Sequence, residues 1–267
     1  MQLSIRHSTK YTFEGEGAYG LQELRLTPKS RPSQNVLNWQ TEVEGGKIEL
    51  QFEDQHANTV LLVSFDGSSA SLQITCSGEV VTNDIAGILG RHGGFAPLWY
   101  FRRNTKRTAP GPLIRKLVRE VREDESDPIA RLHRLSSRIR SLVSYETGTT
   151  TVHTTAEEAL DQAKGVCQDH AQIFVSASRL LGLSSRYVSG YLMMDDRVDQ
   201  DATHAWAETH VEGIGWVAFD VSNGISPDER YVRVATGLDY SEAAPVSGMR
   251  WGNQNKERLA VSLQVAQ

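Results

Sequence analysis

The chain contains few cysteines and no long apolar segment. Cys76 and Cys167 are the only two cysteines in 267 residues, too few for a disulfide framework, so we expect a reducing compartment. No stretch approaches the ~20 consecutive apolar residues that a membrane-spanning helix needs. The first residues alternate in polarity instead of forming the apolar region of a signal peptide. We therefore expect a cytoplasmic protein without a membrane partner.

An excess of positive charge is also missing. The 28 Lys and Arg residues are outnumbered by 33 Asp and Glu residues, and the net charge of −5 argues against nucleic acid as a partner. One segment, 91–119, is locally basic and contains three consecutive aromatic residues, but Pro and Gly interrupt it at 109–112 and acidic residues follow. We interpret it as a connecting segment with a solvated face and place a domain boundary at residue 108.

The composition that remains, 39% hydrophobic and 23% charged, is that of a folded globular protein. From residue 1 to about 77 the pattern is mostly strand-like, bounded by Gly, Asn, Asp and Ser clusters. In the run 72–76, Leu72, Ile74 and Cys76 fall on one face of the expected strand. We therefore expect a β-rich N-terminal domain with Cys76 in its core.

Residues 15–20 match the G-x-G-x-x-G spacing of dinucleotide-binding loops. That fingerprint requires a helix directly afterwards, whereas 21–28 reads as an extended segment ending in Pro28, and Glu16 would repel phosphate. We expect a loop between two strands here and no bound cofactor.

The second half begins with helices and continues with strands. Asp127 and Pro128 mark a helix start, and apolar residues at helical spacing continue to Val143. Extended runs follow at 186–192, 203–211 and 216–219, and the last two are expected to form a hairpin. The acidic segment 193–201 is expected to be a surface loop near the site. This order is typical of an α+β protein. The alternating run 259–265 is expected to return to the N-terminal sheet.

A cysteine lies at the start of the most strongly periodic segment. Gly165 separates this segment from a shorter helix ending near residue 163, for which Thr154 and Glu157 predict a capping box. Cys167 then lies in the first turn, where unpaired N–H groups and the helix dipole favour a thiolate. The alternative is a small core residue on the buried face. That face ends before the terminator Gly182 and contains Cys167, Ala171, Phe174, Ser178 and Leu181.

A thiol nucleophile needs a base, and the base needs an orienting carboxylate or amide. The expected hairpin supplies both, because His204 begins its first strand and Asp220 ends its second. Docking the helix start against these strand ends would assemble a triad of Cys167, His204 and Asp220. Trp206 lies on the strand face of His204 and would either shield the pair from water or fill core. Singly, the histidine is an ordinary surface or core group and the aspartate an ordinary turn former.

Zinc binding is the competing chemical hypothesis. Cys167 and His170 have C-x-x-H spacing, and His204 and His210 share one strand face. However, six residues of strand at ~3.3 Å each separate the two strand histidines by about 20 Å, too far for one ion. We therefore expect no metal.

Five segments of the second half form a combined pattern: TTAEEAL at 154–160, GVCQD at 165–169, RYVSGY at 186–191, HAWAE at 204–208 and GWVAFD at 215–220. Together they resemble the bacterial transglutaminase-like family. More weakly, ELRLTP at 23–28 is similar to the β-rich domain that precedes the core in that family, and 239–248 to its C-terminal tail. Two positions differ from the family pattern: His170 stands where an aromatic residue is usual, and Val221-Ser222 where Pro-Thr is usual.

The resemblance implies a papain-type α+β fold, with helices packed on an antiparallel sheet. It implies Cys167 as nucleophile, His204 as general base and acid, and Asp220 as the orienting residue. We expect a β-rich domain at 1–108 that helps to wall the cleft, a catalytic core at 109–235 and a C-terminal tail at 236–267. A cysteine protease or amidase acting on protein or peptide substrates is expected, without cofactor. A protein-crosslinking transglutaminase and an inactive binding or scaffold protein are the alternatives.

Overall fold

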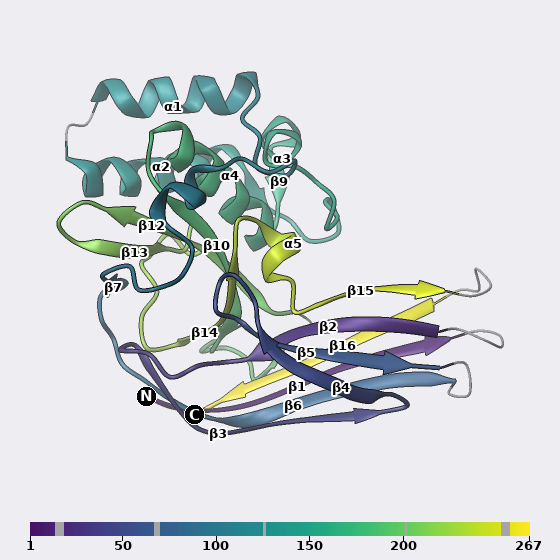
Figure 1. Cartoon of the computed structure of the whole chain (residues 1–267). Coiled ribbons are helices and arrows are strands. Elements are labelled where there is room, and N and C mark those ends of the chain that lie inside the picture. The colour runs from purple at the N-terminus through teal and green to yellow at the C-terminus, as the bar shows by residue number, and fades with distance from the viewer. Residues whose placement is uncertain (14–18, 67–69, 125–126, 201, 252–256) are drawn as a thin grey trace.

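The computed structural model describes residues 1–13, 19–66, 70–124, 127–200, 202–251 and 257–267. The chain has a mixed α+β architecture in which two packed sheets extend from a helix-covered core (Figure 1). The α+β fold expected from the sequence is confirmed, with a β-rich N-terminal region before the helices.

The N-terminal region is a sandwich of two antiparallel sheets. One sheet has the order β11-β16-β1-β6-β3 and the other β15-β2-β5-β4. Along β1 buried and exposed side chains alternate, so one face of the strand lies in the core. Cys76 is fully buried there, as expected. The strands are β1 (Gln2–Phe13), β2 (Tyr19–Thr27), β3 (Gln34–Glu44), β4 (Lys47–Glu53), β5 (Thr59–Phe65), β6 (Ser71–Thr82), β11 (Asp199–Gln200), β15 (Val246–Trp251) and β16 (Glu257–Ala266).

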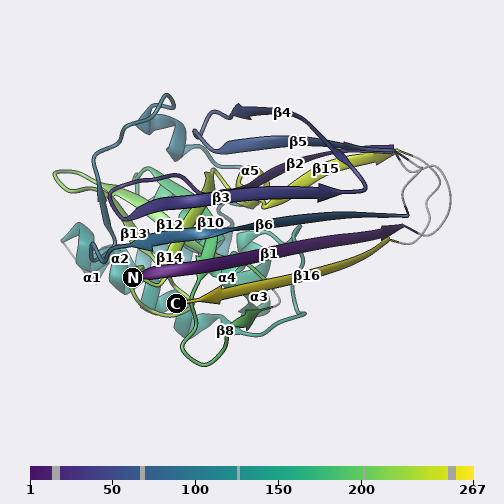
Figure 2. The same ribbon diagram turned by 90° about the horizontal axis from the view of Figure 1, so that it is seen from below.

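The end of the chain completes both sheets of the sandwich. β16 pairs with β1 from Ser4↔Ala266 to Phe13↔Glu257, and β15 pairs with β2. The N- and C-termini consequently lie next to each other (Figure 2). The return of 259–265 to the N-terminal sheet is confirmed. β2 follows the glycine-rich segment directly, so that segment precedes a strand and not a helix, while residues 15–18 themselves lie outside the described ranges.

The core consists of one five-stranded sheet with helices on one face (Figure 1). The sheet order is β14-β10-β12-β13-β7, and side chains of β12 and β13 share a hydrophobic cluster with all four longer helices. The strands are β7 (Ile88–Gly90), β10 (Ser185–Leu192), β12 (His204–Val211), β13 (Gly215–Phe219) and β14 (Tyr231–Gly237). The helices are η1 (Leu98–Arg102), α1 (Pro112–Asp124), α2 (Pro128–Leu142), α3 (Ala156–Gln162), α4 (Cys167–Leu180) and α5 (Tyr240–Ala243).

Two local expectations are wrong. Part of the basic segment 91–119 is not a connection but belongs to the amphipathic helix α1, which buries its apolar face in the core. The capping box of α3 is formed by Thr155 and Glu158, one residue later than expected. The Glu157 carboxylate instead accepts hydrogen bonds from backbone N–H groups at the start of α1, including that of Leu113 at 2.6 Å. Its charge therefore caps a neighbouring helix.

The sandwich and the core share a hydrophobic junction. His7 of β1 contacts the Tyr191 hydroxyl through Nδ1 at 3.0 Å, inside a cluster that includes Leu3, Val232 and Leu263. β7 comes from the range 1–108 yet pairs with β13 of the core, so the expected domain limits stay a prediction. Within the described ranges, no helix combines the length and apolarity needed to span a membrane.

Candidate active site

The start of α4 is fixed by Asp169. Its carboxylate accepts hydrogen bonds from the backbone N–H of Val166 at 2.8 Å and from the Thr150 hydroxyl at 2.7 Å. A Cβ atom at Gly165 would lie 2.8 Å from this side chain, so a residue without a side chain is required before the helix. Cys167 is thereby held as the first residue of α4, among N–H groups that lack intrahelical partners.

The far end of α4 has the expected glycine terminator. Gly182 has φ +91°, and its N–H donates to the carbonyl of Arg179 at 2.9 Å. The N–H of Leu183 donates to the carbonyl of Ser178 at 3.0 Å, which completes a Schellman motif. The limits of the helix predicted from the sequence are confirmed at both ends.

The hairpin of β12 and β13 brings His204 and Asp220 together. The register pairs Ala207 with Phe219, which places the two residues at the same end of adjacent strands. His204 Nε2 and Asp220 Oδ2 are 2.6 Å apart, and both side chains are buried. The histidine ring stacks near Trp206 with 6.3 Å between ring centroids, so Trp206, itself buried, covers the pair as well as filling core.

Two further residues hold the Asp220 carboxylate. The Tyr231 hydroxyl and the Asn223 side-chain amide each donate to Oδ2 at 2.7 Å. Burial would raise the pKa of Asp220, but the hydrogen bonds from His204, Tyr231 and Asn223 lower it overall. Sequence reasoning missed both partners. The sequence does point to Asn223, because it lies in the turn that directly follows Asp220. It does not point to Tyr231, which begins a distant strand.

Cys167 and Asp220 both act on His204. Burial by itself would lower the pKa of His204, but the negative charge of Cys167 and the hydrogen bonds to Asp220 and Cys167 outweigh it and raise the pKa to about 10. The imidazole is therefore positively charged at neutral pH, and the Asp220 carboxylate bonded to it stabilises that charge.

Cys167 and His204 line one cavity of about 360 Å³. Cys167 is 9% exposed, and Tyr145, 56% exposed, stands at the same cavity. Burial and the charges of Cys167 and Asp220 raise the pKa of Tyr145 to about 12, so its hydroxyl stays protonated at neutral pH. The cavity thus combines a thiol, an imidazolium and a phenol.

Described residues of the segment 193–201 line this cavity, as expected for a loop near the site. Met194, Arg197 and Gln200 contribute to the lining, and Asp201 lies outside the described residues. Within the segment, Asp199 and Gln200 form β11, which pairs with β16. None of the described residues that line the cavity belongs to the range 1–108. The N-terminal region therefore supports the wall through β16 and does not form it.

The two positions that differ from the family pattern are in contact with each other. His170 Nδ1 lies 2.9 Å from the Ser222 hydroxyl, and its Nε2 donates to the Val143 carbonyl at 3.0 Å. Burial lowers the pKa of His170 overall, so the neutral ring accepts from Ser222. Both ring nitrogens are thus engaged with non-metal partners. Among the described residues no cluster of three metal-ligating side chains occurs.

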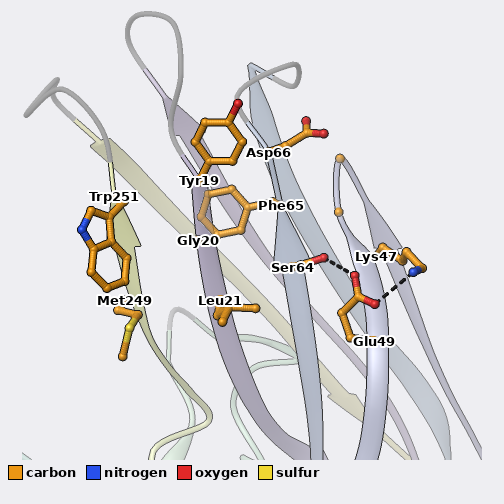
Figure 3. Close-up of a pocket in the computed structure, with 12 residues that line it drawn as sticks. Tyr19, Gly20, Leu21, Lys47, Glu49, Ser64, Phe65, Asp66, Met249 and Trp251 are labelled. Atoms are coloured by element: carbon orange, nitrogen blue, oxygen red, sulfur yellow. Dashed lines mark hydrogen bonds and ion pairs between the residues drawn. The ribbon is translucent and has the colours of Figure 1, made fainter.

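A larger hollow of about 740 Å³ lies elsewhere, on the four-stranded sheet of the sandwich. Figure 3 shows Tyr19, Met249 and Trp251 side by side at this hollow, with Glu49 bonded to Ser64 and Lys47 across from them. None of the described residues that line it is a cysteine or a histidine. Of these two cavities, the one of about 360 Å³ is therefore the one whose described lining holds a thiol and an imidazole.

Fold and geometry together define a class: an α+β protein with a cysteine at a helix N-terminus facing a histidine–aspartate pair on an antiparallel sheet. Sequence comparison gives the family. Residues 115–221 match the transglutaminase-like superfamily and residues 3–81 match the bacterial transglutaminase-like N-terminal region. The chain belongs to the transglutaminase-like superfamily and carries the bacterial type of N-terminal region.

Individual relatives agree with this assignment. An uncharacterized protein of Mycobacterium leprae is 27% identical over 94% of this chain and 94% of its own length. An uncharacterized protein of Mycobacterium tuberculosis is 37% identical over 50% of this chain, and the match spans only 46% of that relative. A solved structure described as a "putative cysteine protease" from Cytophaga hutchinsonii covers 100% of this chain and 98% of its own length, with a TM-score of 0.75 at 19% identity. That likeness shows a shared fold.

Proposed function

We propose that this protein is a thiol-dependent acyl-transfer enzyme acting on peptide or glutamine-type amide bonds, with Cys167, His204 and Asp220 as its catalytic triad. The observation that supports the proposal is the cavity lined by both Cys167 and His204, whose ring is paired with the buried Asp220. Because the pKa of His204 is raised to about 10, its imidazolium is available as a proton donor at neutral pH.

The reaction has two halves. The Cys167 thiolate attacks the amide carbonyl, the C–N bond breaks, and the departing amine takes its proton from the His204 imidazolium. The resulting thioester is attacked by water, which gives its proton to the now neutral His204 ring. The acid product leaves and the thiolate–imidazolium pair is restored. Asp220 keeps the ring oriented throughout, since its carboxylate is itself held by Tyr231 and Asn223.

The negative oxygen of the tetrahedral intermediate requires donors. The backbone N–H of Cys167, in the first turn of α4, is one, and we assign the protonated Tyr145 hydroxyl as the second. β8 (Ser144–Tyr145) pairs with β9 (Lys164–Gly165), which holds Tyr145 beside the start of α4. Tyr145→Phe should lower kcat by about 10²–10³-fold. Tyr240→Phe, at the same cavity, is the matched control, and equal effects of the two changes would contradict the assignment.

Hydrolysis is the reaction we favour, because water needs no second binding site. A lysine amine as acceptor would give a protein-crosslinking transglutaminase, and a chain without turnover would be a binding or scaffold protein. Both cysteines are free thiols, which supports our proposal of a reducing, cytoplasmic location. Fractionation of cells that produce the protein would test this location.

The function is tested by incubating the protein with a panel of peptides and glutamine amides. Release of new amino termini or of ammonia is expected, and Cys167→Ala should abolish it while Cys76→Ala, which changes the other thiol, should retain it. Incorporation of a fluorescent primary amine in place of water would favour the transglutaminase. Peptide binding that persists without turnover in Cys167→Ala and in the unaltered protein alike would favour the scaffold.

A further inference from the structure

A third cavity, of about 210 Å³, lies between the N-terminal sandwich and the core sheet. Tyr187 of β10 packs in the cluster of Cys167 and Ala171, so the neighbouring Arg186 points to the opposite sheet face. Arg186 lines this third cavity, with its guanidinium 3.8 Å from the centre of the Trp216 ring. This cavity and the cavity of Cys167 thus lie on opposite faces of the same sheet.

The lining of this cavity is strongly cationic. Four arginines contribute to it, and none of the described lining residues is an aspartate or glutamate. The carboxylate of Glu208, which is fully buried, accepts hydrogen bonds from the guanidinium groups of Arg186 at 2.5 Å and Arg233 at 2.8 Å. Burial would raise the pKa of Glu208, but these two arginines lower it to about 2. One carboxylate is therefore shared by two guanidinium groups. The arginines are Arg31, Arg91, Arg186 and Arg233.

Arg31 adds a further positive charge, and the carboxylates that act on it are Glu208, already shared by two arginines, and Glu53, which is paired with Lys29. Repulsion from Arg233, followed by burial, lowers the pKa of Arg31 to about 9, and no described carboxylate pairs with its guanidinium. Arg91 is exposed to solvent and does not enter the count. Counting the other three lining arginines, Arg31, Arg186 and Arg233, against Glu208, three positive charges less one negative charge leave a surplus of two. A half-buried surplus of this kind is unfavourable until an anion joins it.

Two buried nitrogens at this cavity also lack partners. Arg233 Nη1 and His56 Nδ1 have no hydrogen-bond partner in the described part of the chain, although both residues line the cavity. The His56 side chain is 0% exposed, and its other nitrogen is 2.7 Å from Glu242. Arg233 uses its remaining nitrogens on Glu208. Buried polar groups are rarely left unpaired, so these atoms indicate a ligand.

We propose that this cavity binds a small tetrahedral oxyanion of the phosphate class, either inorganic phosphate or the terminal phosphate of a small molecule. A dianion matches the surplus of two charges, and guanidinium groups suit phosphate oxygens in geometry and charge. Arg31 and His56 belong to the N-terminal sandwich, whereas Arg186 and Arg233 belong to the core. The bound anion therefore joins the two parts of the chain. This proposal does not depend on the function of Cys167.

Thermal unfolding in inorganic phosphate, compared with chloride at equal ionic strength and pH, tests the site. At a phosphate concentration tenfold above Kd we expect Tm to rise by about 3–6 °C. Sulfate should reproduce the shift, acetate should not, and a larger shift with glycerol phosphate than with phosphate would identify a phosphate ester as the ligand. Equal Tm values in phosphate and chloride, or a larger shift in acetate, would overturn the proposal.

Variants separate a bound anion from general salt effects. Arg31→Gln should lose the phosphate-dependent shift and should not lower Tm in chloride, because it removes the repulsion with Arg233 while leaving Glu208 paired. Arg138→Gln changes the same charge at an exposed position of α2 and should keep the full shift. A full phosphate response in Arg31→Gln, with Arg138→Gln unchanged, would also overturn the proposal.

Discussion

Alkylation of Cys167 by iodoacetamide between pH 8 and pH 6 measures whether His204 holds the sulfur as a thiolate. An ordinary thiol with a pKa near ~8.5 loses about 75-fold of its thiolate over this interval. With its pKa raised to about 10, His204 remains positively charged in about 99% of molecules even at pH 8. The imidazolium that we propose as the partner of the thiolate is thus present throughout, and the alkylation rate of Cys167 should change by less than about twofold.

Peptide mass spectrometry provides the readout and an internal control. Cys76 is fully buried and burial raises the pKa of its thiol to about 11, so it should stay unlabelled until the protein is unfolded. In His204→Ala the rate at Cys167 should regain the dependence of a free thiol, about 75-fold over the same interval. A rate that falls just as steeply in the unaltered protein would refute the ion pair and leave Cys167 as an inert core residue.

Three further changes have defined outcomes. Asp220→Asn should lower kcat/KM for an amide substrate by about 10³–10⁴-fold, because the ring of its partner loses its orienting charge; an unchanged value would exclude Asp220 from the mechanism. Gly165→Ala should lower the free energy of unfolding in urea by about 1–3 kcal/mol, since the new Cβ would lie 2.8 Å from Asp169, whereas at Gly94 a Cβ meets nothing closer than 3.8 Å and the same change should cost little. Burial lowers the pKa of His7 to about 4, so the unfolded chain binds a proton that the folded chain does not as pH falls from about 6.5 to about 4. Stability should drop by about 3 kcal/mol across that window, and His7→Gln should remove most of the drop.

Local signals made the candidate site predictable. The limits of α4 follow from Gly165 and Gly182, which both interrupt the apolar pattern in the sequence. Gly182 is required by its left-handed backbone, and Gly165 by the lack of room beside Asp169, a close neighbour in the chain. The approach of His204 to Asp220 follows from hairpin register, which alternation and turn length determine. The helix α4 and the hairpin are joined by the docking of α4 on β12. That docking was inferred from the need of a thiol nucleophile for a nearby base and from the family resemblance, not from a local sequence pattern.

Contacts between distant segments were not predictable. Tyr231 holds Asp220 from β14, a strand that pairs with β10 and not with the hairpin. His170 and Ser222 are 52 residues apart, and their contact joins two positions that differ from the family pattern. Helix α1 is a different case, because apolar residues at helical spacing were present and the basic residues around them obscured the pattern. The apolar residues of α1 are Ile114, Leu117, Val118 and Val121.

The pairing of β16 with both β1 and β11 has a consequence for protein synthesis. β16 leaves the ribosome after every other described element, yet it supplies the edge against which Asp199 and Gln200 are held. The helices and the hairpin can form earlier, but the wall that these two residues complete cannot. A nascent chain therefore carries Cys167 before the wall beside it is finished, and the cavity takes its final shape only once β16 has paired.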